Sequence, residues 1–364
     1  MEKDAWIPPH GLCSKFQIRI VWVSLEACQT RVSAFGDGFS PSVFHPWLAF
    51  SQFPEPLCRF ATSLPPMPTI QKTTFEGSTA VELNTTVLRL VAIHDVGPRI
   101  AHLGLAGGEN LLLWKPGKYT RGDWDLRGGH RVWVAHPGAD ESEDTYAPDN
   151  DPCKVELLKD GFRLTGAKSP VNATRRGFSV RALADDRLEV DNFVTNVGEM
   201  LYAGGVWALT CTLPGKDARY AIPLGDGSRW DNFTLVNFRT WGGHGKGGFN
   251  DPQIAVGDET LVVTPRGVEN KRMVQAHHGI LAMSDAARGL TFAKKVDWLP
   301  GRQYPLNTNL AFYIGPENFM VEMETMGPEQ TLKPGETLVH REIWILRKGA
   351  VSPDRTAPFV KLFE

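Results

Sequence analysis

The sequence lacks the features that would place it among nucleic-acid-binding or membrane proteins. Lysine and arginine together number 39 against 41 aspartates and glutamates, which leaves a formal net charge of −2. Because neutralising phosphates requires a basic surface, we expect no nucleic-acid partner. The chain also lacks an apolar run of the roughly 18 residues that a membrane-spanning helix needs, and it lacks a recognisable secretory signal. These absences predict a cytoplasmic protein with no membrane contact.

Cysteine is sparse, and its spacing does not match a disulfide framework or a metal site. The chain has five cysteines, of which Cys13, Cys28 and Cys58 fall within the first 66 residues. Cys153 and Cys211 stand alone, without a Cys-x-x-Cys motif or a histidine at metal-ligand spacing. We therefore expect no disulfide, no metal ion and no cofactor.

Residues 1–66 differ from the rest of the chain because they show no sustained apolar period and carry scattered prolines. Their most apolar stretch, residues 16–23, has no neighbour of matching pattern. We interpret 1–66 as a poorly ordered extension, or as an upstream start wrongly taken as the initiator. A targeting segment is the weaker alternative.

From Met67 onward, short apolar segments recur at the spacing of β-strands joined by turns. No segment longer than about ten residues keeps the three-and-four apolar spacing of a helix, so the sequence predicts an all-β class. We expect one β-sandwich domain over 67–350 and a C-terminal tail over 351–364. The expected strands are 80–83, 87–93, 100–105, 111–114, 154–158, 162–164, 178–183, 187–195, 206–213, 260–264, 279–283, 290–294, 310–314, 319–324 and 339–346.

Two predicted connections, 115–150 and 214–257, are long for hairpin loops. Long loops on a rigid sheet scaffold commonly hold ligands. The second contains a glycine-rich run at 242–248, which lacks the strand-before and helix-after context of a phosphate loop. This run is either part of a binding loop or a surface excursion.

The first long connection holds the densest mixture of donors, acceptors and rings in the chain. Sugars present hydroxyls around the ring and an apolar C–H face, so their sites combine aromatic rings with polar groups. If 131–135 forms a strand, Arg131 and Trp133 share one face. Tyr146 and Asp149 are further candidate sugar-binding side chains. The alternative is that Trp133 belongs to the core and Arg131 pairs structurally with a carboxylate.

Near the C-terminus, Glu322 and Glu324 are two residues apart on an expected strand, so both project from the same face. Unpaired buried carboxylates cost free energy, so such a pair is solvated, paired with basic side chains or used in proton transfer. Trp207 follows two glycines and is either the floor of a pocket or an ordinary core residue.

Seven segments carry a family resemblance, namely VGPRI at 96–100, NLL at 110–112, GGHRVW at 128–133, TYAPDN at 145–150, EMETMGP at 322–328, LKPGE at 332–336 and HREIW at 340–344. In this order they resemble bacterial proteins of the domain of unknown function 4380 family, within the galactose-mutarotase-like superfamily. The resemblance spans residues 70 to 347. It implies a galactose-mutarotase-like β-supersandwich and a carbohydrate ligand.

The superfamily resemblance also implies a mechanism. In aldose 1-epimerases a glutamate takes the proton of the anomeric hydroxyl, while a histidine protonates the ring oxygen. Glu324 is similar in place to that glutamate. The segment 126–129 resembles the epimerase Leu-His-Gly-Gly motif, with Arg127 in place of its histidine. Trp207 lies near the place of the second histidine, which leaves His130 as the candidate acid.

Three hypotheses follow. The first is an aldose 1-epimerase-like isomerase with Glu324 as base and His130 as acid. The second is a non-catalytic carbohydrate-binding protein that has lost the acid/base pair, and the third is a different reaction on a sugar or sugar acid. In each case the partner is a small-molecule carbohydrate, and the oligomeric state is left open. The candidate substrate-binding residues are Arg127, Arg131, Trp133, Tyr146, Asp149, Trp207 and Glu322.

We expect a chain that begins at Met67 to fold without residues 1–66, because the strand pattern of the domain starts there. The measurement is the soluble yield and the cooperativity of thermal unfolding of the shortened chain beside the full chain. Loss of solubility would show that the first 66 residues contribute to the core.

Overall fold

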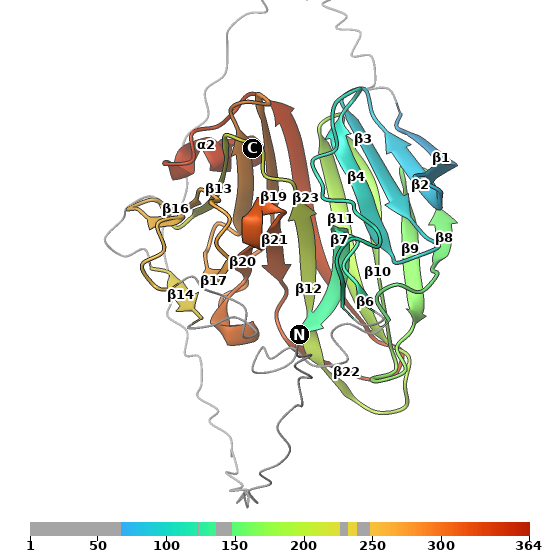
Figure 1. Cartoon of the computed structure of the whole chain (residues 1–364). Helices are drawn as coiled ribbons and strands as arrows, with labels where there is room; N and C mark the ends of the chain where they lie inside the picture. The colour runs from blue at the N-terminus through green and yellow to red at the C-terminus, as the bar shows by residue number, and fades with distance from the viewer. Residues whose placement is uncertain (1–66, 122–123, 136–147, 226–231, 239–247) are drawn as a thin grey trace, which may run out of the picture. The chain divides into compact units, whose positions relative to one another are not determined.

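The computed structural model describes residues 67–121, 124–135, 148–225, 232–238 and 248–364. Within them two antiparallel β-sheets lie face to face, which confirms the all-β class (Figure 1). The expected extension and Tyr146 lie outside the described residues.

The first sheet has 11 strands in the order β1-β2-β3-β4-β7-β12-β21-β20-β17-β14, and β22 pairs with β12 off this path. Their bounds are β1 Thr69–Phe75, β2 Ser78–Asn84, β3 Leu88–Ile93, β4 Arg99–Leu105, β7 Gly129–Ala135, β12 Tyr202–Thr212, β14 Thr234–Asn237, β17 Asn270–Gln275, β20 Leu310–Ile314, β21 Val321–Met326 and β22 Gln330–Leu332.

The second sheet has 10 strands in the order β15-β16-β13-β18-β19-β23-β11-β10-β9-β8. Their bounds are β8 Lys154–Leu157, β9 Gly161–Lys168, β10 Thr174–Ala184, β11 Arg187–Asn196, β13 Ala218–Pro223, β15 Ile254–Val256, β16 Thr260–Val263, β18 Ile280–Asp285, β19 Leu290–Lys295 and β23 Thr337–Lys348. The remaining elements are the paired strands β5 Thr120–Arg121 and β6 Trp124–Asp125, the short helices η1 Pro305–Asn307, η2 Pro316–Asn318 and η3 Lys361–Phe363, and the helix α2 Thr356–Val360.

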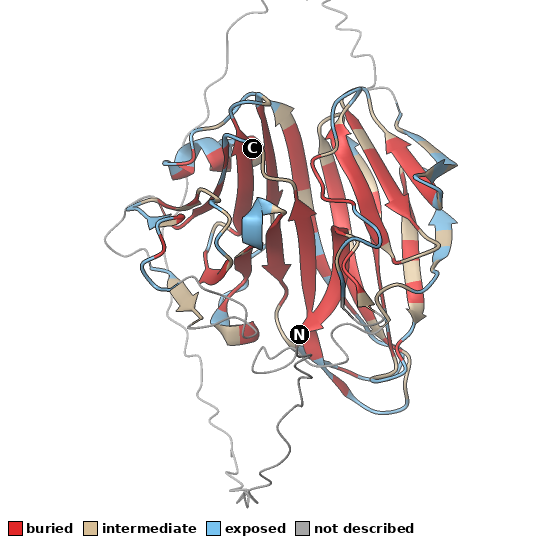
Figure 2. Cartoon of the chain, viewed as in Figure 1, coloured by how far each residue is buried: buried red, intermediate tan, exposed pale blue. Residues whose placement is uncertain are grey.

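The main apolar core fills the space between the two sheets. Because side chains alternate along a strand, every second residue of each inner strand reaches this space. Phe178 and Trp344 enter from the second sheet, and Val132 and Phe312 enter from the first. Most residues of the central strands in both sheets are buried (Figure 2). Fully burying one such apolar side chain contributes on the order of 1.5–3 kcal/mol, so this layer contact is the main stabilising contact of the fold.

Several strands fall where the sequence predicts none. The predicted connection 214–257 contains β13, which lies inside the second sheet, together with β14 and β15. Strand β17 reads NKRMVQ, and all six of its residues are buried because both faces of the strand are covered. A strand covered on both faces has no need of an apolar/polar alternation, so the period-two signal misses it. In contrast, the expected strand 111–114 forms isolated bridges only.

The segment 351–364, expected as a tail, covers part of the second sheet. Phe359 of α2 is fully buried, and it packs with Leu362 against Ala282 and Ile345 of the sheet. These contacts shield the sheet surface that faces away from the core, so the segment contributes to the domain.

A buried polar cluster crosses the space between the sheets, and we call it the interlayer cluster. Lys294 of β19 pairs with the Glu342 carboxylate of β23 at 2.7 Å, with both side chains 0% exposed. The Lys294 ammonium also donates to Thr210 Oγ1 of the first sheet at 3.0 Å. Burial opposes ionisation of Glu342, but the Lys294 ammonium holds its pKa down to about 2. The members of the cluster are His130, Asn192, Thr210, Lys294, Thr325, His340 and Glu342.

Replacing Lys294 by methionine is expected to lower the free energy of unfolding by roughly 3–5 kcal/mol, because the buried Glu342 carboxylate would lose its cation. The matched control is Lys295→Met, since Lys295 projects from the other face of β19 and lies over the Phe363 ring at 5.7 Å. This control should change stability by about 1 kcal/mol or less. Urea unfolding at neutral pH measures both, and equally small losses would contradict the importance of the pair.

Candidate functional site

A cluster of charged and aromatic side chains lies on the face of the first sheet that is turned away from the core, and we call it the outer-face cluster. The strand register explains how it assembles. Arg131 of β7 stands opposite Leu209 of β12, and Leu209 stands opposite Glu324 of β21. Residues directly opposite each other share a face of the sheet. Arg131 and Glu324 therefore lie on one face, although they are far apart in the sequence.

The backbone requires the two glycines at the start of β7, where Gly128 precedes the strand and Gly129 is its first residue. Gly128 and Gly129 have φ values of 96° and 74°, in the region that favours glycine. A Cβ atom on Gly128 would lie 2.2 Å from the Leu113 carbonyl oxygen, and one on Gly129 would lie 2.4 Å from the Ile100 carbonyl oxygen. This tight passage fixes where β7 begins, and so fixes which of its side chains face outward.

The first half of the cluster is built around Trp133. The Arg131 guanidinium lies 4.2 Å from the centre of the Trp133 ring and donates to the Glu322 carboxylate at 2.8 Å. The Trp133 indole N–H donates to Asp149 at 3.1 Å. Asp149 also accepts hydrogen bonds from Trp124 Nε1 at 2.8 Å and from Arg99 Nη2 at 2.7 Å. Burial opposes ionisation of Asp149, but the guanidinium groups lower its pKa below the usual range.

The second half is built around Trp207 and repeats the same arrangement. The Trp207 indole N–H donates to Glu324 Oε2 at 2.8 Å, and the Lys271 ammonium donates to the same oxygen at 2.8 Å. Lys271 Nζ also lies 4.6 Å from the centre of the Trp207 ring. Burial raises the pKa of Glu324. The Lys271 ammonium lowers this pKa, and the neighbouring Glu322 carboxylate raises it further, but the effect of burial is the largest. Each tryptophan thus has a cation over its ring and a carboxylate on its N–H.

The two halves meet edge to face and are bordered by apolar side chains. The ring centres of Trp133 and Trp207 are 5.6 Å apart at 81°. Leu209, Met273, Ala311 and Met326 pack around these two rings. A second apolar group borders the cluster on the side of Cys211 and contains Leu113, Leu126, Cys211 and Met320, with Tyr119 and Phe319 packed against it.

The structure brings most of the predicted site residues together. Arg131, Trp133, Asp149, Trp207, Glu322 and Glu324 all belong to the outer-face cluster. Arg127 lies at its edge, where its Nε donates to Asn150 Oδ1 at 3.0 Å, the residue next to Asp149. Tyr146 lies outside the described residues.

His130 does not lie on this face, so the expectation that it faces Glu324 as an acid is corrected. Its ring belongs to the interlayer cluster, 2.9 Å from Thr210 Oγ1 and 2.8 Å from Asn192 Oδ1. Since Asn192 uses its amide N–H on Glu342, its carbonyl oxygen accepts the His130 Nε2 proton. Burial lowers the pKa of His130 to about 4. The sheet itself separates this neutral ring from any ligand beside Glu324.

The sequence did not identify Lys271, Arg99 or Trp124 as site residues. Lys271 lies on β17, which the alternation signal misses. Its pairing with Glu324 of β21 reaches across β20, which lies between the two strands in the sheet. Arg99 lies within the VGPRI segment at 96–100, and it is fully buried beside Asp149. An arginine at the start of a strand is a weak sequence signal by itself.

The described residues hold no group of three histidine, cysteine, aspartate or glutamate side chains suited to a metal ion. Within the same part of the chain, no helix is long and apolar enough to cross a membrane.

Several solved structures have a fold similar to that of this chain. A galactose mutarotase-like protein from Lactobacillus casei ATCC 334 matches 74% of this chain and 100% of its own, with a TM-score of 0.53 and 12% identity. A candidate aldose 1-epimerase from Escherichia coli K12 matches 77% and 99%, with a TM-score of 0.50 and 14% identity. A candidate mutarotase from Salmonella typhimurium matches 77% and 94%, with a TM-score of 0.50 and 12% identity.

The protein therefore has the galactose mutarotase-like, aldose 1-epimerase-like β-sandwich fold. No protein-family model matches the sequence, and no curated protein matches it. At 12–14% identity the likeness concerns the fold, so the role of each residue has to be argued from this chain's own site.

Acid is expected to destabilise the fold between about pH 6.5 and 4. His130 and His340 are neutral in the folded state because burial lowers the pKa of each to about 4, whereas an unfolded histidine takes up a proton near pH 6.5. Their contribution is complete above the unfolded value and is lost as the pH falls toward the folded value. Urea midpoints across this range measure the effect. A His340→Gln variant should show a shallower dependence, and an unchanged slope would contradict the assignment.

Proposed function

We propose that this chain is a carbohydrate-binding protein of the galactose mutarotase-like type, and that the outer-face cluster is its binding site. Membership of the domain of unknown function 4380 family is part of the same proposal, supported by the ordered motifs between residues 96 and 344. The observation that carries the proposal is the pair of tryptophans, each with a cation and a carboxylate, on one face of the sheet.

The chemistry of the cluster fits a polyhydroxylated ring. Sugar hydroxyls both donate and accept, and the carboxylates of Asp149, Glu322 and Glu324 accept hydrogen bonds, while Arg131 and Lys271 donate them. Trp133 and Trp207 are 3% and 7% exposed, and in the proposed complex the exposed parts of their indole rings contact the C–H face of the sugar. Ion pairs between these groups hold their geometry in advance, which reduces the ordering cost of binding.

Binding without catalysis is favoured over anomer interconversion. Mutarotation needs a base and an acid on opposite sides of one sugar ring. Glu324 is held by the Lys271 ammonium at 2.8 Å, and the described strands β7, β12, β21, β20 and β17 direct no histidine to the outer face. The proposed activity is therefore recognition of a sugar.

An aldose 1-epimerase-like activity is the second candidate, and one observation favours it. Burial raises the pKa of Glu324, which moves a carboxylate toward the range in which it can exchange protons with a substrate near neutral pH. In this alternative Glu324 is the base, and the acid comes from a group other than His130.

The test of binding is calorimetric titration of the full chain with a panel of free aldoses and sugar acids. Glu324→Gln is expected to weaken binding of the recognised sugar by about tenfold or more, because hydrogen bonds to a charged group are among the stronger ones. The matched control is Glu156→Gln, which removes an exposed carboxylate from β8 at the far edge of the second sheet. Affinity that is the same in both variants would contradict the assignment of the site.

Anomer exchange, followed by NMR with the same sugars, separates the two candidate functions. Binding without acceleration of exchange is expected from the proposal. Acceleration that Glu324→Gln abolishes would establish the second candidate instead.

A further inference from the structure

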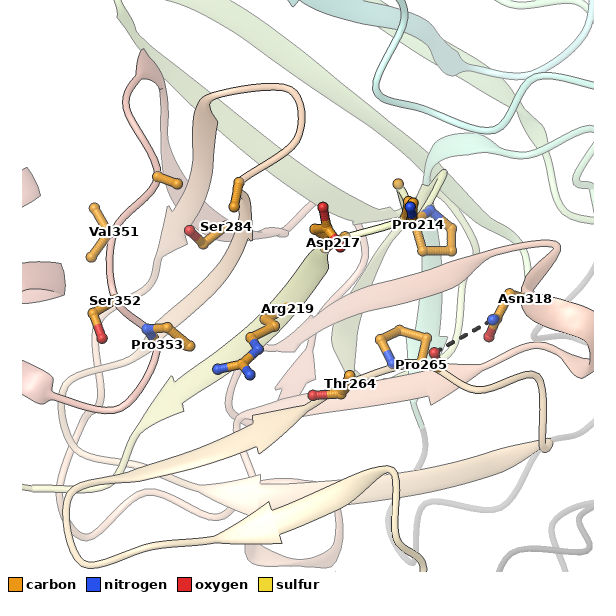
Figure 3. Close-up of a pocket in the computed structure, with 15 residues that line it drawn as sticks. Pro214, Asp217, Arg219, Thr264, Pro265, Ser284, Asn318, Val351, Ser352 and Pro353 are labelled. Carbon is orange, nitrogen blue, oxygen red and sulfur yellow. Dashed lines mark hydrogen bonds between the residues drawn. The ribbon is translucent and has the colours of Figure 1, made fainter.

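A hollow of about 850 Å³ lies over β13 and β18 of the second sheet, and none of its lining residues belongs to the outer-face cluster (Figure 3). Its floor comes from β13 and β18, where Arg219 stands opposite Ser284. The neighbouring residues Tyr220 and Met283 point into the core, so Arg219 and Ser284 face outward. The volume is in the range of small-molecule pockets, roughly 300–1,000 Å³.

Three chain segments form most of the walls, and Asn318 of η2 adds to them. Lys216 and Asp217 come from the connection before β13, and Thr264 directly follows β16. The third wall is residues 350–353, which precede the C-terminal helix α2. The Arg219 side chain lies between Thr264 and this third wall (Figure 3). Proline and valine side chains add apolar surface to the walls.

Three polar side chains of this pocket, Lys216, Arg219 and Ser284, have no hydrogen-bond or ion-pair partner among the described residues. Ser284 is 5% exposed as a residue, its side chain lines the pocket, and across the described residues its hydroxyl makes no hydrogen bond. The hydroxyl is therefore open to a ligand in the pocket. The same described part of the chain gives neither Lys216 nor Arg219 an ion-pair partner. A ligand with acceptor oxygens would satisfy all three.

The charge of the lining is positive. Lys216 and Arg219 face a single lining carboxylate, that of Asp217. Asp285 lies just behind Gly215, but its charge is compensated by Arg288 at 2.7 Å. Ser352 at the rim donates to Asp354 at 3.3 Å, and Asn318 donates to the Pro265 carbonyl oxygen at 3.4 Å. The Ser284 and Thr264 hydroxyls are neutral donors that no such bond occupies.

We propose that this pocket binds a small ligand that carries an oxyanion, either a phosphate or a carboxylate group. The Arg219 guanidinium and the Lys216 ammonium bind the anion, and the Ser284 hydroxyl donates the hydrogen bond that it lacks in the protein. The apolar wall at 350–353 contacts the carbon skeleton. This site is independent of the proposed sugar site, with which it shares no residue.

The experiment is calorimetric titration of the full chain with inorganic phosphate, a hexose phosphate, a hexuronic acid and the corresponding neutral hexose. The two anionic classes identify which oxyanion is preferred. We expect saturable binding of at least one anion, weakened about tenfold by Arg219→Gln. The matched control is Arg175→Gln, which removes an exposed arginine from β10 of the same sheet and should leave the affinity unchanged.

A second variant, Ser284→Ala, keeps the charge of the pocket and is expected to weaken the same anion severalfold. Glu324→Gln should leave anion binding intact, which separates this pocket from the sugar site. The proposal is overturned if no anion binds, if Arg219→Gln and Arg175→Gln have equal effects, or if the neutral hexose binds here as tightly as its charged derivatives.

Discussion

The register of β7, β12 and β21 is the constraint on which the rest of this molecule depends. Side chains on a strand alternate between two faces, so a pairing shift of one residue would exchange every inward and outward group. Such a shift in β7 would move Arg131 between the sheets and His130 to the outer face. In the observed register Arg131 meets Glu322, and His130 meets Thr210 and Asn192.

The same three strands therefore carry polar clusters on both faces. Thr210 and Thr325 reach inward to Lys294 and Glu342, while their neighbours Leu209 and Glu324 face outward. Each inward group has a partner of the right kind, since Lys294 is compensated by Glu342 and each neutral histidine has a threonine beside it. A buried network with all its members satisfied resists displacement, because every alternative register would leave donors and acceptors unpaired.

The fold is shared with galactose mutarotase-like proteins at 12–14% identity. The side chains on the outer face of the first sheet are particular to this chain. A tryptophan and a lysine hold Glu324, where the epimerase resemblance implied a histidine opposite the glutamate. The outer surface of the second sheet adds a pocket whose lining residues come from β13, β18 and the segment before α2. Function in such a fold depends on the groups that line each site rather than on the architecture.

The sequence by itself determined the all-β class, the strand character of 131–135 and the common face of Glu322 and Glu324, because these follow from the local alternation of side chains. It also supplied the residues around which the outer-face cluster forms. Tertiary structure alone decided that Lys271 binds Glu324 and that His130 lies between the sheets. Strand β17 shows no alternation, because it is buried on both faces. The face that a histidine takes depends on pairing with strands about 80 residues away in the sequence.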